Sequence, residues 1–231
     1  MKEQLRGWRH IFKLDPERSI SDECLSQLCQ SGTHAIMVGG SSGVTYANTE
    51  DLLLRIRKYS VPCVLEISNQ YAIVPGFDLF FVPIVLNTDD AQWIVGHHHR
   101  AIKAYGDLLP WGDIIAEAYV IMNAQSTAAV LTKANPHQDQ HDLVSYARMA
   151  DKLFHFPVLY LEYSGRFGDM ELVRRVASVL ENTRLFYGGG IDNLVKAQEA
   201  AQYAHTIIVG NVIYENFEQA LKTVQIIKMD L

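Results

Sequence analysis

Short apolar runs alternate with amphipathic segments along the whole chain. The runs are rich in aliphatic and aromatic residues, and their length is typical of strands buried on both faces. The segments between them repeat apolar residues at helical spacing. The pattern predicts strands at His10–Leu14, Ala35–Val38, Cys63–Ile67, Leu79–Val85, Ile114–Ile121, Val158–Tyr163, Arg184–Tyr187 and Thr206–Val209.

Helices are expected between most of these strands. Asp169 and Asp192 each precede a helical pattern and are expected to cap it. Strands that alternate with helices are parallel and are joined by right-handed crossovers. About eight such units predict a single (β/α)8 TIM barrel over residues 1–231. The expected helices are Asp22–Gln30, Thr49–Lys58, Asp90–Tyr105, Gln140–Phe154, Asp169–Glu181, Asn193–Gln202 and Tyr214–Lys228.

Two connections break the alternation. The segment between Ile67 and Leu79 is too short, and too interrupted by Pro75 and Gly76, for an ordinary crossover helix. We therefore expect an irregular third βα connection. The segment 123–140 is long, and long loops in compact domains are often functional, although the sequence does not define its role.

Composition and charge narrow the function classes. With 48% hydrophobic and 20% charged residues, the chain is typical of a globular protein. Its net charge of −6 argues against general nucleic-acid binding, so an anionic substrate must be held by local donors. The N-terminal residues contain no apolar signal core, and every apolar run is shorter than the about 18 residues that span a membrane. We expect a cytoplasmic protein, with peripheral membrane contact left open.

Two glycine turns near the C-terminus predict a phosphate site. Gly188, Gly189 and Gly190 follow one predicted strand, and Gly210-Asn211 follows the next. Glycine lets backbone N–H groups approach an anion closely, and a following helix adds positive partial charge. Turns after the last two strands of a (β/α)8 barrel form the phosphate cradle of that fold. The chain is therefore expected to handle a small phosphorylated molecule.

The ends of the first two strands carry candidate ligands for a phosphate and a metal. Lys13 and Asp15 share one side of the first strand, where lysine offers a point charge and aspartate a hard oxygen for Mg²⁺. Residues 39–45 form a glycine- and hydroxyl-rich loop that includes Ser41 and suits a diphosphate with its metal. A surface ion pair and a plain turn are the alternative interpretations.

The sixth strand ends in the densest polar cluster. Tyr160, Glu162 and Ser164 alternate and therefore share one face. A carboxylate inside an apolar barrel needs a partner, because an unpaired buried charge is costly. A substrate hydroxyl is one candidate partner, which would make Glu162 a general base. A structural ion pair between Glu162 and Lys13 is the other.

Taken together, these motifs resemble those of the PcrB-type heptaprenylglyceryl phosphate synthases, which are relatives of the archaeal geranylgeranylglyceryl phosphate synthases. The resemblance covers nearly the whole chain. Each motif is weak alone, but seven in the same order are specific. They are residues 12–16 (FKLDP), 39–41 (GGS), 61–66 (VPCVLE), 73–78 (IVPGFD), 160–165 (YLEYSG), 185–191 (LFYGGGI) and 209–211 (VGN).

The resemblance implies an altered third βα unit and transfer of a heptaprenyl chain from its diphosphate to the C3 hydroxyl of sn-glycerol 1-phosphate. It implies Mg²⁺ as the cofactor, with Asp15 and Ser41 as ligands, and a homodimer. It implies that glycerol 1-phosphate contacts Lys13, Tyr160, Leu161, Glu162, Tyr163, Ser164, Gly165, Gly190, Gly210 and Asn211.

A long prenyl tail also needs an apolar groove. The candidates are Ala101, Tyr105 and Tyr119, beside the fourth-strand run and Trp93. A small residue such as Ala101 leaves room for a long tail, and the accepted chain length is not fixed by the sequence. A metal-free phosphate-binding barrel, either an isomerase or a lyase, is the alternative function. It would share the glycine cradle but would leave Asp15 and Ser41 unexplained.

Overall fold

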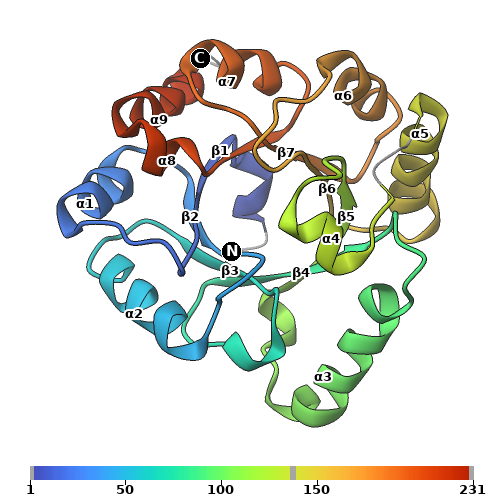
Figure 1. Cartoon of the computed structure of the whole chain (residues 1–231), viewed down its shortest axis with the longest axis horizontal. Helices are drawn as coiled ribbons and strands as arrows, with labels where there is room; N and C mark the ends of the chain where they lie inside the picture. Colours follow the sequence, from blue (N-terminus) through green and yellow to red (C-terminus); the bar gives the residue numbers. More distant parts are fainter. Residues whose placement is uncertain (1–2, 136–138, 229–231) are drawn as a thin grey trace.

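The computed structural model describes residues 3–135 and 139–228. Eight parallel strands pair in chain order and close into a barrel, with helices around the outside (Figure 1). This confirms the predicted (β/α)8 architecture. The strands are β1 (His10–Leu14), β2 (Ala35–Val38), β3 (Cys63–Glu66), β4 (Leu79–Val85), β5 (Ile114–Ile121), β6 (Val158–Glu162), β7 (Arg184–Gly188) and β8 (Thr206–Val209).

The larger helices lie between the strands, and several are shorter than the apolar pattern predicts. They are α1 (Asp22–Gln30), α2 (Tyr46–Ile56), α3 (His97–Tyr105), α4 (Thr127–Thr132), α5 (Gln140–Arg148), α6 (Met170–Ala177), α7 (Leu194–Ala201), α8 (Val212–Glu215) and α9 (Phe217–Thr223). Short 3₁₀ or π segments are η1 (Gln4–Gly7), η2 (Gln70–Ala72), η3 (Gln92–Gly96), η4 (Gly106–Leu108), η5 (Trp111–Asp113), η6 (Met149–Leu153) and η7 (Val224–Lys228). None of the helices in this described part of the chain has both the length and the apolar character to cross a membrane.

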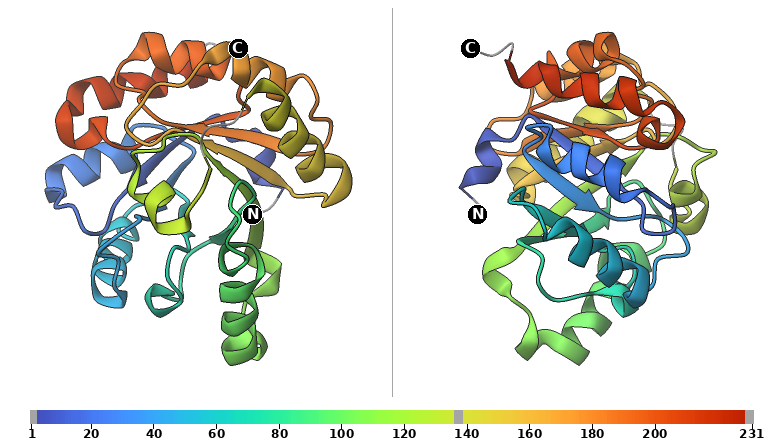
Figure 2. Two further views of the ribbon diagram at one scale, coloured as in Figure 1. Left: turned by 45° about the vertical axis from the view of Figure 1, so that its right-hand side comes forward. Right: turned by 90° about the vertical axis from the view of Figure 1, so that its left-hand side faces the viewer.

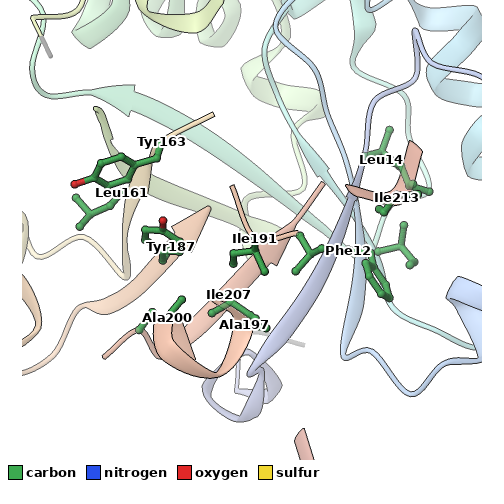
Figure 3. Close-up of a cluster of buried hydrophobic side chains, with 14 of the residues drawn as sticks. Phe12, Leu14, Leu161, Tyr163, Tyr187, Ile191, Ala197, Ala200, Ile207 and Ile213 are labelled. Carbon is green, nitrogen blue, oxygen red and sulfur yellow. The ribbon is translucent and has the colours of Figure 1, made fainter. Parts of the chain in front are cut away.

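Strand residues divide between two apolar clusters according to the direction of their side chains. One cluster draws a buried residue from each of the eight strands, such as Met37, Phe81 and Phe186, and fills the barrel interior. The other joins strand residues to the surrounding helices. Figure 3 shows part of it, with Tyr187 of β7 and Ile207 of β8 on the side of Ala197 and Ala200 of α7. Burying one such large side chain contributes about 1.5–3 kcal/mol.

The connection from β3 to β4 is irregular, as the sequence predicts. It contains only the short helix η2 and an irregular stretch with a turn at Pro75-Gly76, in which Val74 and Phe77 are buried. The Asp78 carboxylate accepts a hydrogen bond from the Cys63 backbone at 2.8 Å and pairs with Arg57 at 2.7 Å. These contacts fasten the segment to the barrel without a crossover helix.

Helix α3 stands away from the barrel, most clearly in the left view of Figure 2. Each of its residues keeps part of its surface accessible to solvent. On the adjacent strand β4, Val82 and Ile84 are only half-buried. The predicted helix 90–105 is therefore a π turn, η3, followed by α3, and the pair leaves an apolar face of the barrel partly open.

Three local predictions need correction. Asp169 caps α6 as predicted, but α7 is capped by Asn193, whose side chain accepts from the Lys196 backbone, while Asp192 pairs with Lys196 instead. The predicted helix 214–228 is broken at Asn216, whose φ of −151° and ψ of 86° are not helical and whose side chain caps α9. The long segment after β5 contains α4, which Ser126 caps.

Candidate active site

A cavity of about 440 Å³ opens at the carboxyl ends of the strands. It is lined by residues that follow β1, β2, β6, β7 and β8 and by the start of α4. This is the end of the barrel where (β/α)8 proteins bind their ligands. The predicted site residues in its lining are Lys13, Asp15, Ser41, Tyr160, Glu162, Ser164, Gly165, Gly190, Gly210 and Asn211.

Two glycines expose bare backbone to this cavity for different reasons. Gly190 has a φ of +60°, and a Cβ there would overlap the backbone of Arg166 and Phe167, so the turn itself requires glycine. At Gly210 a Cβ would lie 3.6 Å from the Lys13 carbonyl oxygen, which is ordinary contact. The protein therefore has room for a side chain at Gly210, and its absence leaves space for a ligand beside the backbone.

The structure brings Asp15 and the loop after β2 together. The Asp15 carboxylate lies so close to Gly40 that a Cβ there would collide with it, and Ser41 is the next residue. Oδ1 of Asp15 accepts a hydrogen bond from the Glu17 backbone at 2.9 Å. Partial burial raises the pKa of Asp15 above its ordinary value. The Asp15 carboxylate and the loop that contains Ser41 therefore lie at one rim of the cavity.

Glu162 is held by three donors. Its Oε1 accepts from the Ser164 backbone at 2.6 Å and from the Ser164 hydroxyl at 2.7 Å, and its Oε2 accepts from the Tyr119 hydroxyl at 2.9 Å. The side chain is 5% exposed. These bonds orient a carboxylate toward the cavity, where it can accept a proton from a bound hydroxyl.

Lys13 pairs with Glu66, so the alternative ion pair between Lys13 and Glu162 is wrong. Lys13 Nζ lies 2.5 Å from Glu66 Oε2, with the two side chains 18% and 6% exposed. Burial acts to lower the pKa of Lys13, but the Glu66 and Glu162 carboxylates outweigh it and raise that pKa above its ordinary value. The ammonium group stays charged beside the cavity, already held by one carboxylate.

Two residues of the sixth-strand motif face away from the cavity. Leu161 and Tyr163 are buried between the strands and the helices, and Figure 3 shows them on that outer side. Neither residue lines the cavity, and the Tyr163 backbone N–H donates to the Gly188 carbonyl oxygen at 2.7 Å. Gly165, with a φ of +74°, and Ser164 continue the motif along the cavity wall.

The three predicted groove residues lie in two places. Ala101 is half-buried and Tyr105 is 41% exposed on α3. Tyr119 lies inside the barrel, where it is 6% exposed, bonds to Glu162 and packs against the Tyr160 ring with centroids 4.9 Å apart. Tyr119 therefore lies beside Glu162, whereas Ala101 and Tyr105 lie one turn apart on α3.

Sequence reasoning missed several residues that shape the cavity. Tyr214 accepts from the Asp15 backbone at 3.0 Å, and the Arg18 guanidinium stacks over the Tyr214 ring at 3.9 Å. Asn123 donates to the Ser164 carbonyl oxygen at 2.7 Å and supports the loop after β6. Alternation along β3 could have pointed to Glu66, which follows inward-facing Val64 by two residues.

A closed (β/α)8 barrel with bare glycine backbone after β7 and β8 and oxygen donors at its other strand ends is a phosphate-binding barrel. The chain belongs to the PcrB family, whose sequence pattern matches residues 3–228. Heptaprenylglyceryl phosphate synthase from Geobacillus kaustophilus is 53% identical over 226 residues, which cover 98% of this chain and 95% of the relative. The enzyme of the same name from Bacillus cytotoxicus is 52% identical, with 96% of each chain covered.

Solved structures agree with this assignment. The (S)-3-O-geranylgeranylglyceryl phosphate synthase from Thermoplasma acidophilum, in complex with sn-glycerol-1-phosphate, superposes with a TM-score of 0.85 at 26% identity and covers 98% of this chain and 96% of its own. Thiamine phosphate pyrophosphorylase from Pyrococcus furiosus reaches a TM-score of 0.63 at 14% identity, covering 98% of this chain and 99% of its own. At that level of identity the likeness concerns the fold alone.

Proposed function

We propose that this protein transfers a long polyprenyl chain from polyprenyl diphosphate to the C3 hydroxyl of sn-glycerol 1-phosphate and forms an ether. The observation that carries the proposal is a single cavity in which a glycine cradle, a rim of hard oxygen donors and the oriented carboxylate of Glu162 meet. Relatives at about half identity over nearly the full length carry the name heptaprenylglyceryl phosphate synthase, which supports heptaprenyl diphosphate as the donor.

The acceptor phosphate is assigned to the turns at Gly190 and Gly210-Asn211. Gly210 leaves open space beside the backbone, which suits a phosphate oxygen accepting from an N–H group. Lys13 adds positive charge next to this cradle. Fixing the phosphate there orients the other end of a three-carbon glycerol toward Glu162, and such positioning lowers the barrier to reaction.

Glu162 is assigned as the general base. The reaction forms a bond between the C3 oxygen of glycerol phosphate and the first carbon of the prenyl chain. The bond between that carbon and the diphosphate oxygen breaks, and the electron pair leaves with the diphosphate. The C3 hydroxyl proton passes to Glu162, whose other donors, Ser164 and Tyr119, hold the carboxylate in place.

The oxygen donors at the rim fit Mg²⁺. Asp15 and Ser41 would hold it, and residues 3–135 and 139–228 contain no cluster of three or more acidic, histidine or cysteine side chains that could complete a metal site. Magnesium commonly binds through one or two protein oxygens together with substrate phosphates, so diphosphate oxygens are the natural remaining ligands. When bound, the ion supplies positive charge that stabilises the departing diphosphate.

The prenyl tail is assigned to the open face beside α3. Val82 and Ile84 of β4 are half-buried there, and His98 of α3 bonds to the Pro83 carbonyl oxygen between them at 3.0 Å. Several large apolar side chains nearby are exposed, namely Val95, Ile102, Leu108 and Trp111. Exposed apolar surface of this kind supports contact with a membrane that carries the donor, or with a second subunit of a homodimer.

Product formation tests the activity. Labelled sn-glycerol 1-phosphate, Mg²⁺ and polyprenyl diphosphates of increasing length are incubated with the protein, and label is followed into the organic phase by extraction and mass spectrometry. We expect the heptaprenyl ether as a product. A phosphate-binding isomerase or lyase would leave all label in water.

Glu162→Gln tests the base. Glutamine keeps the shape and can still accept from Ser164, so glycerol 1-phosphate binding should persist while turnover falls by about 100-fold or more. Glu218→Gln, which makes the same change at an exposed glutamate on α9 that does not line the cavity, is the matched control. Unchanged turnover in Glu162→Gln would remove Glu162 from the mechanism.

A further inference from the structure

The barrel interior contains a carboxylate that the proposed mechanism does not use. Glu117 lies on β5 between the inward-facing residues Ile115 and Tyr119, and its side chain is fully buried. Neither of its oxygens has a hydrogen-bond partner within the described residues. An isolated ionised carboxylate in such a place costs several kcal/mol, so its state needs an explanation.

Five ionisable groups from β1, β3, β5 and β6 surround Glu117. They are Lys13 on β1, Glu66 on β3, Tyr119 on β5, and Tyr160 and Glu162 on β6. Strands β2, β4 and β8 contribute no aspartate, glutamate, histidine, lysine or arginine, as their sequences AIMV, LFFVPIV and TIIV show.

The remaining strand, β7, begins with Arg184. Its guanidinium donates to the carbonyl oxygens of Trp8 and His205 at 3.1 and 3.4 Å, both at the opposite end of the barrel from the cavity. It is therefore not among the groups that act on Glu117.

Charges in this group do not balance if every carboxyl is ionised. Glu66, Glu117 and Glu162 would supply three negative charges against the single ammonium of Lys13, beneath a cavity suited to anions. Lys13 is bonded to Oε2 of Glu66, and Oε1 of Glu66 is buried without a partner among the described residues. A neutral carboxylic acid at Glu117 would make the charge of this group one unit less negative, so that only Glu66 and Glu162 oppose Lys13.

We propose that Glu117 carries a proton in the folded protein and, by staying neutral beside the ion pair of Lys13 and Glu66, acts as a positioning residue for that pair. The inference rests on the proposed function only for its ligand, glycerol 1-phosphate. Burial first, and the Glu66 carboxylate second, raise the pKa of Glu117 well above its ordinary value. The protonated form therefore persists to higher pH than in a free glutamate.

Protonation of Glu117 should make the affinity for glycerol 1-phosphate fall as pH rises. Below the raised pKa Glu117 is neutral, and the charge beneath the cavity is one unit less negative than above it. As pH rises through that pKa, the new charge repels a bound phosphate, so affinity for glycerol 1-phosphate falls. A residue that only filled space would not link affinity to pH in this way.

Infrared spectroscopy tests the proton directly and needs no ligand. At neutral pH the wild-type protein should show the C=O stretching band of a protonated carboxylic acid, which shifts in D₂O and is absent from Glu117→Gln. Glu218→Gln, which changes an exposed glutamate on α9, should leave the band unchanged. Absence of the band from wild type, or its persistence in Glu117→Gln, would overturn the proposal.

Calorimetry with glycerol 1-phosphate tests the coupling. Glutamine mimics the neutral acid, so Glu117→Gln should bind within about two-fold of wild type at neutral pH and lose less affinity at alkaline pH. Glu117→Met is a second neutral variant should the glutamine variant not fold. A loss of ten-fold or more at neutral pH in a folded variant would refute the assignment. Failure of wild type to bind the ligand would instead contradict the proposed function and leave the infrared result standing.

Discussion

Replacing Gly210 with alanine should weaken phosphate binding without destabilising the fold. Gly210 follows β8 and lines the cavity, and its φ is not among the left-handed values. A Cβ there would meet the Lys13 carbonyl oxygen at 3.6 Å and the Lys13 Cβ at 4.0 Å, both ordinary van der Waals distances. The folded protein therefore accommodates the methyl group, but the space beside the backbone is filled.

The expected size of the effect follows from the geometry of a charge-assisted hydrogen bond. A phosphate oxygen that accepts from a backbone N–H lies about 2.7–2.9 Å from the nitrogen. A methyl group in the space beside the backbone holds that oxygen at about 3.5 Å from the methyl carbon, and so prevents it from reaching the N–H group. Losing one hydrogen bond to a charged group costs about 1.5–3 kcal/mol. Since 1.4 kcal/mol is a factor of ten, Gly210→Ala should raise the Kd for glycerol 1-phosphate by about 10- to 150-fold.

Titration calorimetry gives the Kd, and thermal unfolding gives the stability of each variant. Gly112→Ala, on the exposed η5 turn where a Cβ would meet nothing within 4 Å, is the control that should change neither quantity. Gly190→Ala should lose both binding and stability, because its φ is +60° and the Cβ overlaps backbone. A Gly210→Ala protein with unchanged Tm and a Kd within two-fold of wild type would refute the assignment of the phosphate to the Gly210 turn.

Two further predictions concern the metal and the response to pH. Asp15→Asn should raise the Mg²⁺ concentration needed for half-maximal rate by about ten-fold, while the Kd for glycerol 1-phosphate stays within two-fold of wild type. EDTA should abolish turnover of the wild-type protein. Turnover that survives EDTA would contradict the metal assignment. His10 is buried between the hydroxyls of Thr33 and Thr223, each 2.9 Å away, and burial lowers its pKa to about 3. Its contribution to stability is full above the unfolded pKa of about 6.5 and is lost as pH falls toward 3. The Tm of His10→Gln should accordingly fall less steeply over that range, and parallel curves would show that His10 is not responsible.

The strand pattern was sufficient to predict the barrel because strands buried on both faces form continuous apolar runs. Alternation also placed Lys13, Glu162 and Ser164 correctly on the cavity side, since successive side chains point to opposite faces. Helix ends were less accurate. Asn216 interrupts the last helix, because its backbone is not helical and its side chain caps α9. An asparagine side chain that bonds to the nearby backbone competes with the helical hydrogen bonds, and the spacing of apolar residues does not reveal which of the two prevails.

Contacts across the barrel could not be derived from the chain. Alternation says that Lys13 and Glu66 both face inward, but not whether Lys13 reaches Glu66 or Glu162, because the pairing depends on strand tilt and register. Tyr119 shows the same limit. The sequence offers it as a candidate for the tail groove but does not predict that its hydroxyl donates to Glu162 across the closed barrel. The open position of α3 was equally hidden, since its sequence is as amphipathic as that of packed helices.

The three interior glutamates make different contacts, and these contacts indicate different roles. Glu66 is occupied by Lys13, and Glu117 lacks partners within the described chain and does not line the cavity. Glu162 alone of the three both lines the cavity and is oriented by donors on each of its oxygens. A base that must take a proton from a bound hydroxyl needs that access and that orientation. If Glu117 holds a proton of its own, it also spares Glu162 a second neighbouring negative charge, so the buried acid and the working base are parts of one electrostatic arrangement.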